Sequence, residues 1–263
     1  MTETRSFFTD GQAYERLMGR WSRAAGTTFL DWLALPKGLD WLDVGCGTGA
    51  FTELVIERCA PKEIDAIDPA EDQIAFARSR AAAVPAKFRT GDAQALPYPD
   101  DAFDVAALAL VISFLPDAVK ALSEMARVTR PGGTLGAYMW DGLGKGYVQQ
   151  PLVDAIEKMN VPVPQSPLRR NSRIDEMQRL FEGAGLAGVT TRTIEIEVSY
   201  PNFDDYWSAQ TGLANTAVQP IRAMSAPDVE RLKAYLREHL PTDGNGRLAY
   251  PARANAVKGR VPA

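Results

Sequence analysis

The chain has 263 residues, with 46% hydrophobic and 24% charged residues and a formal net charge of −4. This composition is typical of a globular protein of one large domain or two small ones, and excludes disordered, collagen-like and coiled-coil chains. The mildly acidic balance argues against nucleic-acid binding, which needs a basic surface, and no apolar run is long enough to cross a bilayer.

Apolar residues at helical spacing predict a first helix around Tyr14 and Trp21 and a second over residues 24–35. From residue 39 to residue 140, apolar strands alternate with helical segments. The expected strands cover residues 39–44, 63–68, 87–89, 103–110 and 134–140, and the helices between them residues 48–58, 71–83 and 118–128. This alternation predicts right-handed βαβ units and a parallel sheet.

The pattern is less regular after residue 140. Glycines and prolines over residues 141–167 predict a loop region. A helix over residues 173–184, a strand over residues 191–200 and a last strand over residues 247–257 follow from their apolar spacing. A helical stretch over residues 203–240 is expected in two pieces, interrupted near Pro220 and Pro227.

A glycine-rich turn, Gly45-Cys-Gly-Thr-Gly49, joins the first expected strand to the following helix. Such a junction is a ligand site, because glycines let a ligand approach the backbone. Gly45, Gly47 and Ala50 fit the loose dinucleotide fingerprint, and Asp68 lies near the spacing expected for a ribose-binding acid. A nicotinamide or flavin oxidoreductase is therefore one interpretation.

Charge favours a different ligand. Asp43 precedes the turn by two residues and would repel a pyrophosphate. S-adenosylmethionine carries no phosphate, and its cationic ammonium suits this carboxylate. Asp68 and Asp92 follow the next two strands, where a carboxylate can accept from ribose hydroxyls or from an adenine amino group. The three acids and the turn together predict a cationic ligand that contains a nucleoside.

These segments resemble the class I S-adenosylmethionine-dependent methyltransferases, and within them the ubiquinone/menaquinone C-methyltransferase-like subgroup. The resemblance rests on Leu42-Asp-Val-Gly-Cys-Gly-Thr-Gly49, Asp68-Pro69, Gly91-Asp92-Ala93, Ala102-Phe-Asp104 and Arg130-Pro-Gly-Gly133. It implies a Rossmann-like, doubly wound α/β fold with a seven-stranded sheet, six strands parallel and the last antiparallel beside the fifth. It also implies cap helices over residues 1–35, an α/β core over residues 36–200, a helical substrate cap over residues 201–245 and the last core strand over residues 246–263.

The resemblance further implies a role for each matching position in binding S-adenosyl-L-methionine. The methionine part of the cofactor would contact Asp43, Gly45, Cys46, Gly47 and Gly49. The nucleoside part would contact Asp68, Pro69, Gln73, Asp92 and Ala93. Leu108 and Ala109 would approach the sulfonium, and Tyr14 and Arg20 would close over the cofactor from the N-terminal helix.

The acceptor is less defined. Ser113-Phe114 stands where many subgroup members carry histidines, so their roles cannot be transferred to this chain. The only histidine, His239, is expected at the end of a helix, and we assign no catalytic base and no metal. Aromatic residues could line an acceptor pocket beneath the helical cap; the candidates are Tyr138, Trp140, Tyr206 and Trp207.

Three expectations concern the molecule as a whole. We expect a small-molecule acceptor and a monomer or homodimer. A protein that binds S-adenosylmethionine without catalysis is the further alternative. Two cysteines, Cys46 and Cys59, with no recognisable signal peptide predict a cytoplasmic protein with unreactive thiols.

Overall fold

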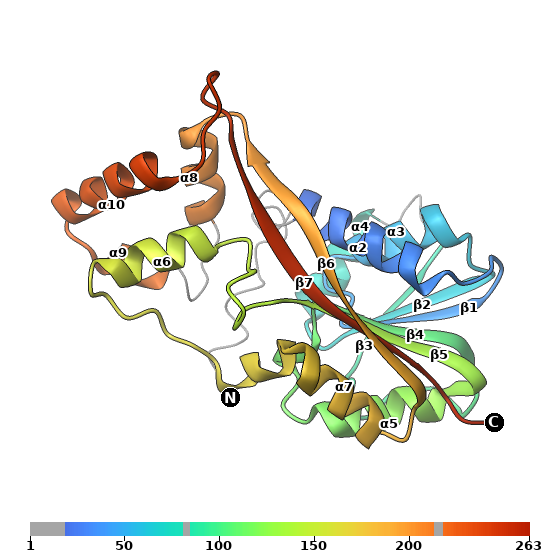
Figure 1. Ribbon diagram of the computed structural model, residues 1–263. Coiled ribbons are helices and arrows are strands. Elements are labelled where there is room, and N and C mark those ends of the chain that lie inside the picture. Colours follow the sequence, from blue (N-terminus) through green and yellow to red (C-terminus); the bar gives the residue numbers. More distant parts are fainter. Residues whose placement is uncertain (1–18, 81–84, 213–217) are drawn as a thin grey trace.

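The computed structural model describes residues 19–80, 85–212 and 218–263. Its centre is a seven-stranded sheet with the order β3-β2-β1-β4-β5-β7-β6 (Figure 1). The strands are β1 (Asp40–Val44), β2 (Glu63–Asp68), β3 (Lys87–Thr90), β4 (Phe103–Ala109), β5 (Thr129–Trp140), β6 (Ala187–Tyr200) and β7 (Leu248–Arg260). β7 is antiparallel to both of its neighbours, β5 and β6. The predicted fold class, with six parallel strands and an antiparallel last strand, is confirmed.

Helices cover both faces of the sheet. In Figure 1, α2 (Arg20–Leu33), α3 (Ala50–Cys59) and α4 (Glu71–Arg80) lie on one side, and α5 (Ala118–Val128) and α7 (Ile174–Gly183) lie on the other. β1 buries all five of its residues because it is covered on both faces. Trp41 packs into the core that contains α2 and α3, and Leu42 packs into the core that contains α5 and α7.

Four helices form a separate group, the helical lobe, around the far ends of β6 and β7 (Figure 1). They are α6 (Gln150–Lys158), α8 (Phe203–Gly212), α9 (Gln219–Ala223) and α10 (Ala226–His239). Buried side chains of the lobe, such as Ile156 and Leu236, belong to the same hydrophobic cluster as Phe29 and Tyr138 of the sheet region. The lobe therefore shares a continuous core with one face of the sheet. No helix of the described ranges is both long and apolar enough to cross a membrane.

One prediction was wrong after residue 140. The expected loop over residues 141–167 contains α6, which has Pro151 in its first turn and buries Leu152, Ala155 and Ile156. These three positions have helical spacing, and the surrounding glycines and prolines obscured it. The helical stretch expected in two pieces forms α8, α9 and α10 in the described residues. Its breaks near Pro220 and Pro227 are as predicted, because both prolines lie in the first turns of α9 and α10, where a missing N–H costs nothing.

The strand boundaries also differ. β5 begins at Thr129 and therefore includes the Arg130-Pro-Gly-Gly133 segment that was expected to precede it. β6 begins at Ala187, four residues earlier than predicted. Both additions lie at the amino ends of their strands, so the carboxyl ends that border a ligand site remain as predicted.

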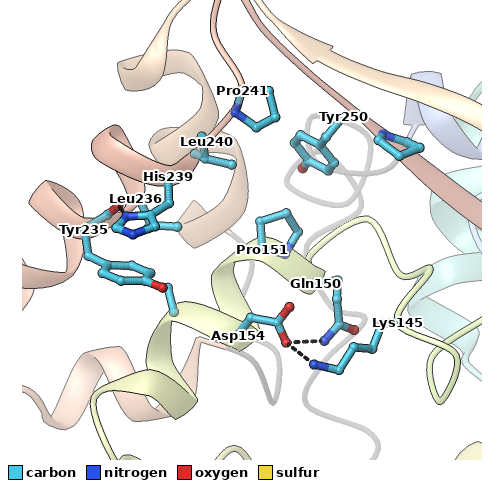
Figure 2. Close-up of a pocket in the computed structure, with 12 residues that line it drawn as sticks. Lys145, Gln150, Pro151, Asp154, Tyr235, Leu236, His239, Leu240, Pro241 and Tyr250 are labelled. Atoms are coloured by element: carbon cyan, nitrogen blue, oxygen red, sulfur yellow. Dashed lines mark hydrogen bonds and ion pairs between the residues drawn. The ribbon is translucent and has the colours of Figure 1, made fainter.

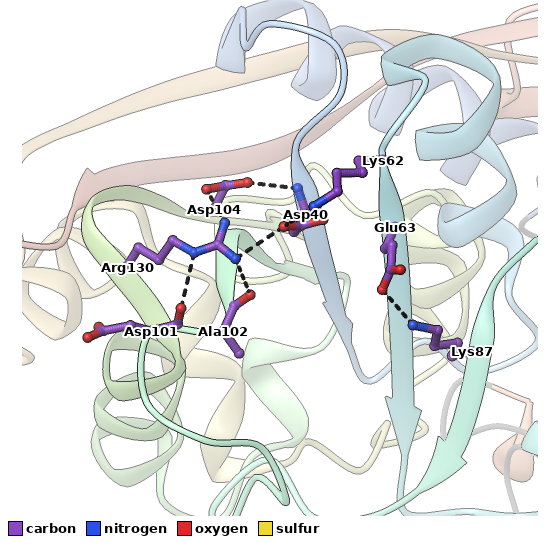
Figure 3. A network of polar contacts seen from close by, with 8 residues as sticks. All are labelled: Asp40, Lys62, Glu63, Lys87, Asp101, Ala102, Asp104 and Arg130. Atoms are coloured by element: carbon purple, nitrogen blue, oxygen red, sulfur yellow. Dashed lines mark hydrogen bonds and ion pairs between the residues drawn. The ribbon is translucent and has the colours of Figure 1, made fainter.

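Arg130 ties together the amino ends of three strands (Figure 3). Its guanidinium pairs with Asp104 of β4 at 2.5 Å and with Asp40 of β1 at 3.1 Å. It also donates to the backbone carbonyls of Asp101 and Ala102. Burial would raise the pKa of Asp104, but hydrogen bonds from the Asp40 N–H and from Arg130 hold it below its ordinary value. The charged groups at this end of the sheet therefore hold the strands together, with each charge compensated.

Replacing Arg130 with Met should lower the free energy of unfolding by about 1–2 kcal/mol, because Asp104 loses its ion pair and Asp40 keeps only the more distant, exposed Lys62 at 3.6 Å. Urea denaturation measures this loss. The matched control is Arg179→Met, which removes an exposed pair with Glu176 within one helix and should leave stability nearly unchanged. Equal losses in the two variants would contradict the interpretation.

Candidate functional site

The glycine turn lies between the end of β1 and the start of α3. The backbone N–H groups of Gly45 and Cys46 both donate to the carbonyl of Ile67, which fastens the turn to β2. Gly45 has φ +76°, and a Cβ there would lie 2.5 Å from a Val111 methyl carbon. Gly47 has φ +52°, and a Cβ there would have no atom closer than 3.8 Å. The turn is therefore packed at Gly45 and open at Gly47, where a ligand can approach the backbone.

Asp43 lies under the turn and is 1% exposed. Its Oδ2 accepts a 2.6 Å hydrogen bond from the Thr52 hydroxyl, and its Oδ1 has no hydrogen-bond partner within the described residues. Burial raises the pKa of Asp43 to about 7, the Thr52 hydrogen bond opposes this rise, and the charge of Asp68 adds to it. A buried carboxylate with one unsatisfied oxygen is a site prepared for a cation.

Asp68 ends β2 and supports the turn from the other side. Its Oδ2 accepts from the Gly47 N–H at 3.0 Å, and its Oδ1 accepts from the Ala70 N–H at 2.9 Å. Burial raises the pKa of Asp68, and the two backbone hydrogen bonds oppose this rise. Each oxygen keeps a second lone pair, so the carboxylate can still accept hydrogen bonds from a ligand.

The third acid lies beside the second. The carbonyl of Asp68 accepts from the Gly91 N–H at 3.1 Å, which places Asp92 next to the end of β2. Asp92 is exposed and accepts from the backbone N–H of Gln94, whereas Ala93 is buried. β1, β2 and β3 are neighbours in the sheet, so the structure brings Asp43, Asp68 and Asp92 to one edge, as the sequence predicted.

The other predicted cofactor residues occupy different environments. Pro69 is exposed at the end of β2, and Gln73 is 6% exposed in α4 with its side chain beside Gly47. Leu108 is fully buried in the core below the edge, so only its backbone can face a ligand, whereas Ala109 is half-buried. Cys46 is buried in the turn, and Cys59 ends α3.

Both cysteines have the properties of unreactive thiols. Burial raises the pKa of Cys46 well above its ordinary value, and the charges of Asp43 and Asp68 act in the same direction. Burial also raises the pKa of Cys59, where Arg58 opposes the change. The thiolate, which is the nucleophile and metal ligand, is therefore disfavoured at both positions.

The side chains of two predicted cofactor residues lie outside what the structure describes. Tyr14 lies outside the described residues. Arg20 is the first residue of α2, and its side chain also falls outside what the structure describes. The role of closing over the cofactor remains a prediction for both.

The four aromatic residues predicted for an acceptor pocket belong to one hydrophobic cluster or pack against it, with different neighbours. Tyr138 contacts Phe29 at a ring-centroid distance of 4.9 Å and joins α2 to the sheet. Trp140 is 3% exposed at the end of β5. Tyr206 of the lobe packs edge-on against Tyr200 at 5.4 Å, and its hydroxyl has no hydrogen-bond partner within the described chain. Trp207 stacks on Phe203.

The lobe contains a cleft that sequence reasoning missed (Figure 2). It lies between α6 and α10 and has a volume of about 310 Å³. Asp154 accepts hydrogen bonds from Lys145 at 3.2 Å and from Gln150 at 2.9 Å at its rim. His239 borders the same cleft, is exposed, and stacks on Tyr235 at 3.9 Å. The cleft depends on the pairing of α6 with α10, so a sequence interpretation that lacked α6 could not find it.

Histidine, cysteine and acidic residues do not gather into a metal-binding group anywhere in the described ranges. The site consists instead of backbone N–H groups, three carboxylates and a turn open at Gly47.

Comparison with known proteins gives a family match over the same segment. Residues 42–137 match the model of a methyltransferase domain. The chain is 34% identical over 168 residues to a malonyl-(acyl-carrier protein) O-methyltransferase of Serratia marcescens, covering 60% of this chain and 63% of that protein. It is 38% identical over 118 residues to a demethylmenaquinone methyltransferase of Thermus thermophilus, covering 44% of this chain and 52% of that protein. In both cases the match spans less than two thirds of the relative's length.

Solved structures show the same fold at low sequence identity. The YcgJ protein of Bacillus subtilis superimposes with a TM-score of 0.60 at 19% identity, covering 91% of this chain and 98% of that one. The phosphoethanolamine N-methyltransferase 2 of Haemonchus contortus, solved in complex with S-adenosyl-L-methionine, gives a TM-score of 0.60 at 16% identity. That match covers 100% of this chain and 61% of the other.

Asp43 should make the ligand-free protein less stable as the pH rises. An acid whose pKa is about 7 in the fold and 3.8 ordinarily binds its proton more tightly in the folded chain, so the fold loses stability between these pH values. Asp43→Asn should therefore raise the free energy of unfolding by roughly 4 kcal/mol at pH 8 and by roughly 2 kcal/mol at pH 5. Denaturant titrations at both pH values measure the difference. A stabilisation independent of pH would exclude ionisation as its cause.

Proposed function

We propose that this chain, whose residues 42–137 match a methyltransferase domain, is a class I S-adenosylmethionine-dependent methyltransferase that transfers a methyl group to a small-molecule acceptor. The observation that carries the proposal is the unpartnered, buried Oδ1 of Asp43 beneath a glycine turn that is open at Gly47. Its environment suits an ammonium and opposes a pyrophosphate, which separates S-adenosylmethionine from a dinucleotide.

The residues present fit this cofactor. Asp43 would accept from its ammonium, with Thr52 holding the carboxylate in place. Asp68 would accept from the ribose hydroxyls while keeping its hydrogen bonds from Gly47 and Ala70. The exposed Asp92 carboxylate would accept from the adenine amino group, and the Ala93 N–H would donate to a ring nitrogen. When bound, the cofactor supplies an electrophilic methyl group with a neutral thioether as its leaving group.

Positioning accounts for catalysis in this proposal. A leaving group that needs no proton removes the need for a general acid, and aligning two reactants lowers the barrier by ~7–11 kcal/mol. His239 is exposed at the end of α10, and we assign it no catalytic role. The chain would bind and orient both partners through the glycine turn and the groups that follow β4 and β5. We further propose a cytoplasmic location, as expected for two free cysteines, with the enzyme as a monomer or homodimer.

Calorimetric titration with S-adenosylmethionine, its demethylated product and NAD tests the cofactor. We expect binding of the first two in the micromolar range and no binding of NAD; heat from NAD alone would refute the assignment. A methyl-transfer screen with labelled cofactor against small phenols, quinols, amines and carboxylates then tests turnover. Binding without transfer to any acceptor would favour the non-catalytic alternative.

The assignment of Asp68 to the ribose has its own test. Asp68→Ala should weaken cofactor binding at least ~10-fold, because it removes an acceptor at the edge, the hydrogen bond to Gly47 of the turn and the hydrogen bond to Ala70 after β2. Asp65→Ala is the matched control: Asp65 lies within β2 and pairs with Arg89 at 3.7 Å, so its loss should change affinity little. Equal losses of affinity in the two variants would refute the ribose assignment.

Cofactor affinity should rise with pH across the pKa of Asp43. With that pKa at about 7 in the free protein, binding an ammonium at pH 6 requires the carboxyl to lose its proton, and this lowers affinity by about 10-fold relative to pH 8. Titrations in buffers of different ionisation enthalpy should show proton release at pH 6. The Asp43→Asn variant should bind more weakly and release no proton, and an unchanged proton count in it would assign the release to another group.

A further inference from the structure

Two short 3-10 turns lie against each other at the carboxyl edge of the sheet. The first, η4 (Ile112–Phe114), follows β4, and the second, η5 (Pro167–Ser172), precedes α7. The Asn171 amide donates to the carbonyl of Ile112 at 3.3 Å, and the Asn255 amide of β7 donates to the carbonyl of Ser172 at 2.9 Å. Both asparagines are about 5% exposed. The two turns are therefore fixed to the sheet and to each other.

The turns lie next to the proposed cofactor site. Val111, the residue before η4, fills the space that a side chain at Gly45 would need. β4 and β5 are adjacent strands, and Ala109 pairs with Tyr138 near their carboxyl ends. η4 therefore adjoins the glycine turn through Val111, η5 adjoins η4, and the loop after β5 adjoins η5. An acceptor must approach from this region to meet the methyl group.

Arg169 of η5 is a half-buried cation without a carboxylate. Its guanidinium donates to the carbonyl of Gly142, in the loop after β5, and to the side chain of Gln165. Burial lowers the pKa of Arg169, and only Tyr147 and Glu157 act against this change. Within the described residues no carboxylate lies at ion-pair distance from it. A partly desolvated cation without a counter-charge costs free energy unless a ligand compensates it.

The other half-buried arginines differ from Arg169 in having carboxylate partners. Among the arginines whose side chains are described, four others are half-buried, and each has a carboxylate within 3.2 Å. They are Arg80 with Glu53, Arg127 with Glu124 and Asp100, Arg130 with Asp104 and Asp40, and Arg253 with Asp141. Arg169 alone in this set lacks one.

Two further features of these adjoining turns are relevant. A Cβ at Gly142 would lie 2.9 Å from an Nη of Arg169, so the glycine provides the space that the guanidinium occupies. Ser113 of η4 is 5% exposed, and its hydroxyl has no hydrogen-bond partner within the described chain. The adjoining turns thus carry an uncompensated cation and an unsatisfied hydroxyl. Both groups can donate hydrogen bonds to an anion.

We propose that Arg169 binds an anionic group of the methyl acceptor, a carboxylate or a phosphate, with the Ser113 hydroxyl as a second donor. The inference rests on the proposed methyltransferase function and adds the chemical class of the substrate. The bidentate fork of an arginine suits either anion. Arg169 is a specificity-determining residue in this assignment and takes no part in bond making.

The test uses the full chain loaded with the demethylated cofactor product, titrated with succinate and, separately, with inorganic phosphate. Arg169→Met should weaken binding of the preferred anion at least ~10-fold with unchanged affinity for the cofactor product. Gly142→Ala displaces the guanidinium without removing it, and should therefore also weaken binding of the anion. Arg170→Met is the matched control, because Arg170 is exposed in the same turn and its loss should leave anion binding unchanged.

The two anions distinguish which anionic group the acceptor carries. Binding of succinate alone identifies a carboxylate acceptor, and binding of phosphate alone identifies a phosphate acceptor. In the methyl-transfer screen, Arg169→Met should raise the KM of the anionic acceptor more than it lowers kcat, and Arg169→Lys should restore part of the loss. Methylation of neutral acceptors only, or equal effects of Arg169→Met and Arg170→Met, would overturn this inference while leaving the methyltransferase function intact. Absence of cofactor binding would instead refute the function itself.

Discussion

Burial of the Asp43 carboxylate is the constraint on which the site depends. Because β1 is covered on both faces, its penultimate residue lies almost entirely out of water, with one oxygen held by Thr52 and the other unsatisfied. Such a group costs free energy in the empty protein. The cost is compatible with function because an ammonium at this position would satisfy the free oxygen and restore the charge. Burial of this carboxylate therefore lowers the stability of the empty protein and makes the site selective for a cation.

The two ends of the parallel strands differ in whether their charged side chains have partners of opposite charge. At the amino ends, Arg130 pairs with Asp40 and Asp104, so the charges are matched within the chain. At the carboxyl ends, Asp43 and Arg169 lack partners of opposite charge within the described residues. This contrast separates an end that holds strands together from an end arranged for ligands. The unmatched groups differ in sign, which suits a cationic cofactor and an anionic acceptor side by side.

Sequence reasoning succeeded where a residue's position follows from the strand that carries it. Asp43, Asp68 and Asp92 each end or follow a strand in a regular βαβ pattern, so their common edge was predictable from topology. The antiparallel position of β7 beside β5 was implied by the family resemblance and not by this pattern, and the structure confirms it. It missed α6, because Pro151 and the neighbouring glycines resemble a loop although Leu152 and Ile156 keep helical spacing.

Arg169 illustrates a different limit. An arginine in a proline-rich segment is ordinarily a solvated surface charge, and nothing in its neighbours along the chain indicates otherwise. Its significance depends on Gly142, which is distant in sequence but leaves room for the guanidinium. It also depends on the lack of a carboxylate nearby, which only the folded chain reveals. Interactions of this kind depend on tertiary contacts and cannot be derived from local pattern.

The long β6–β7 pair affects which parts of the chain can accept substitutions during evolution. These strands pair from Ala187 with Arg260 to Tyr200 with Leu248 and reach beyond the sheet to carry the helical lobe. The family match covers residues 42–137 and includes neither strand nor any helix of the lobe. The β6–β7 pair therefore connects two parts of the molecule. One end of it pairs with β5 in the sheet, and the other end carries the helices of the lobe, which can differ without changing that pairing. In the proposed function, substitutions in the lobe would alter which acceptor is methylated, while the strand ends that would hold the methyl donor stay in register.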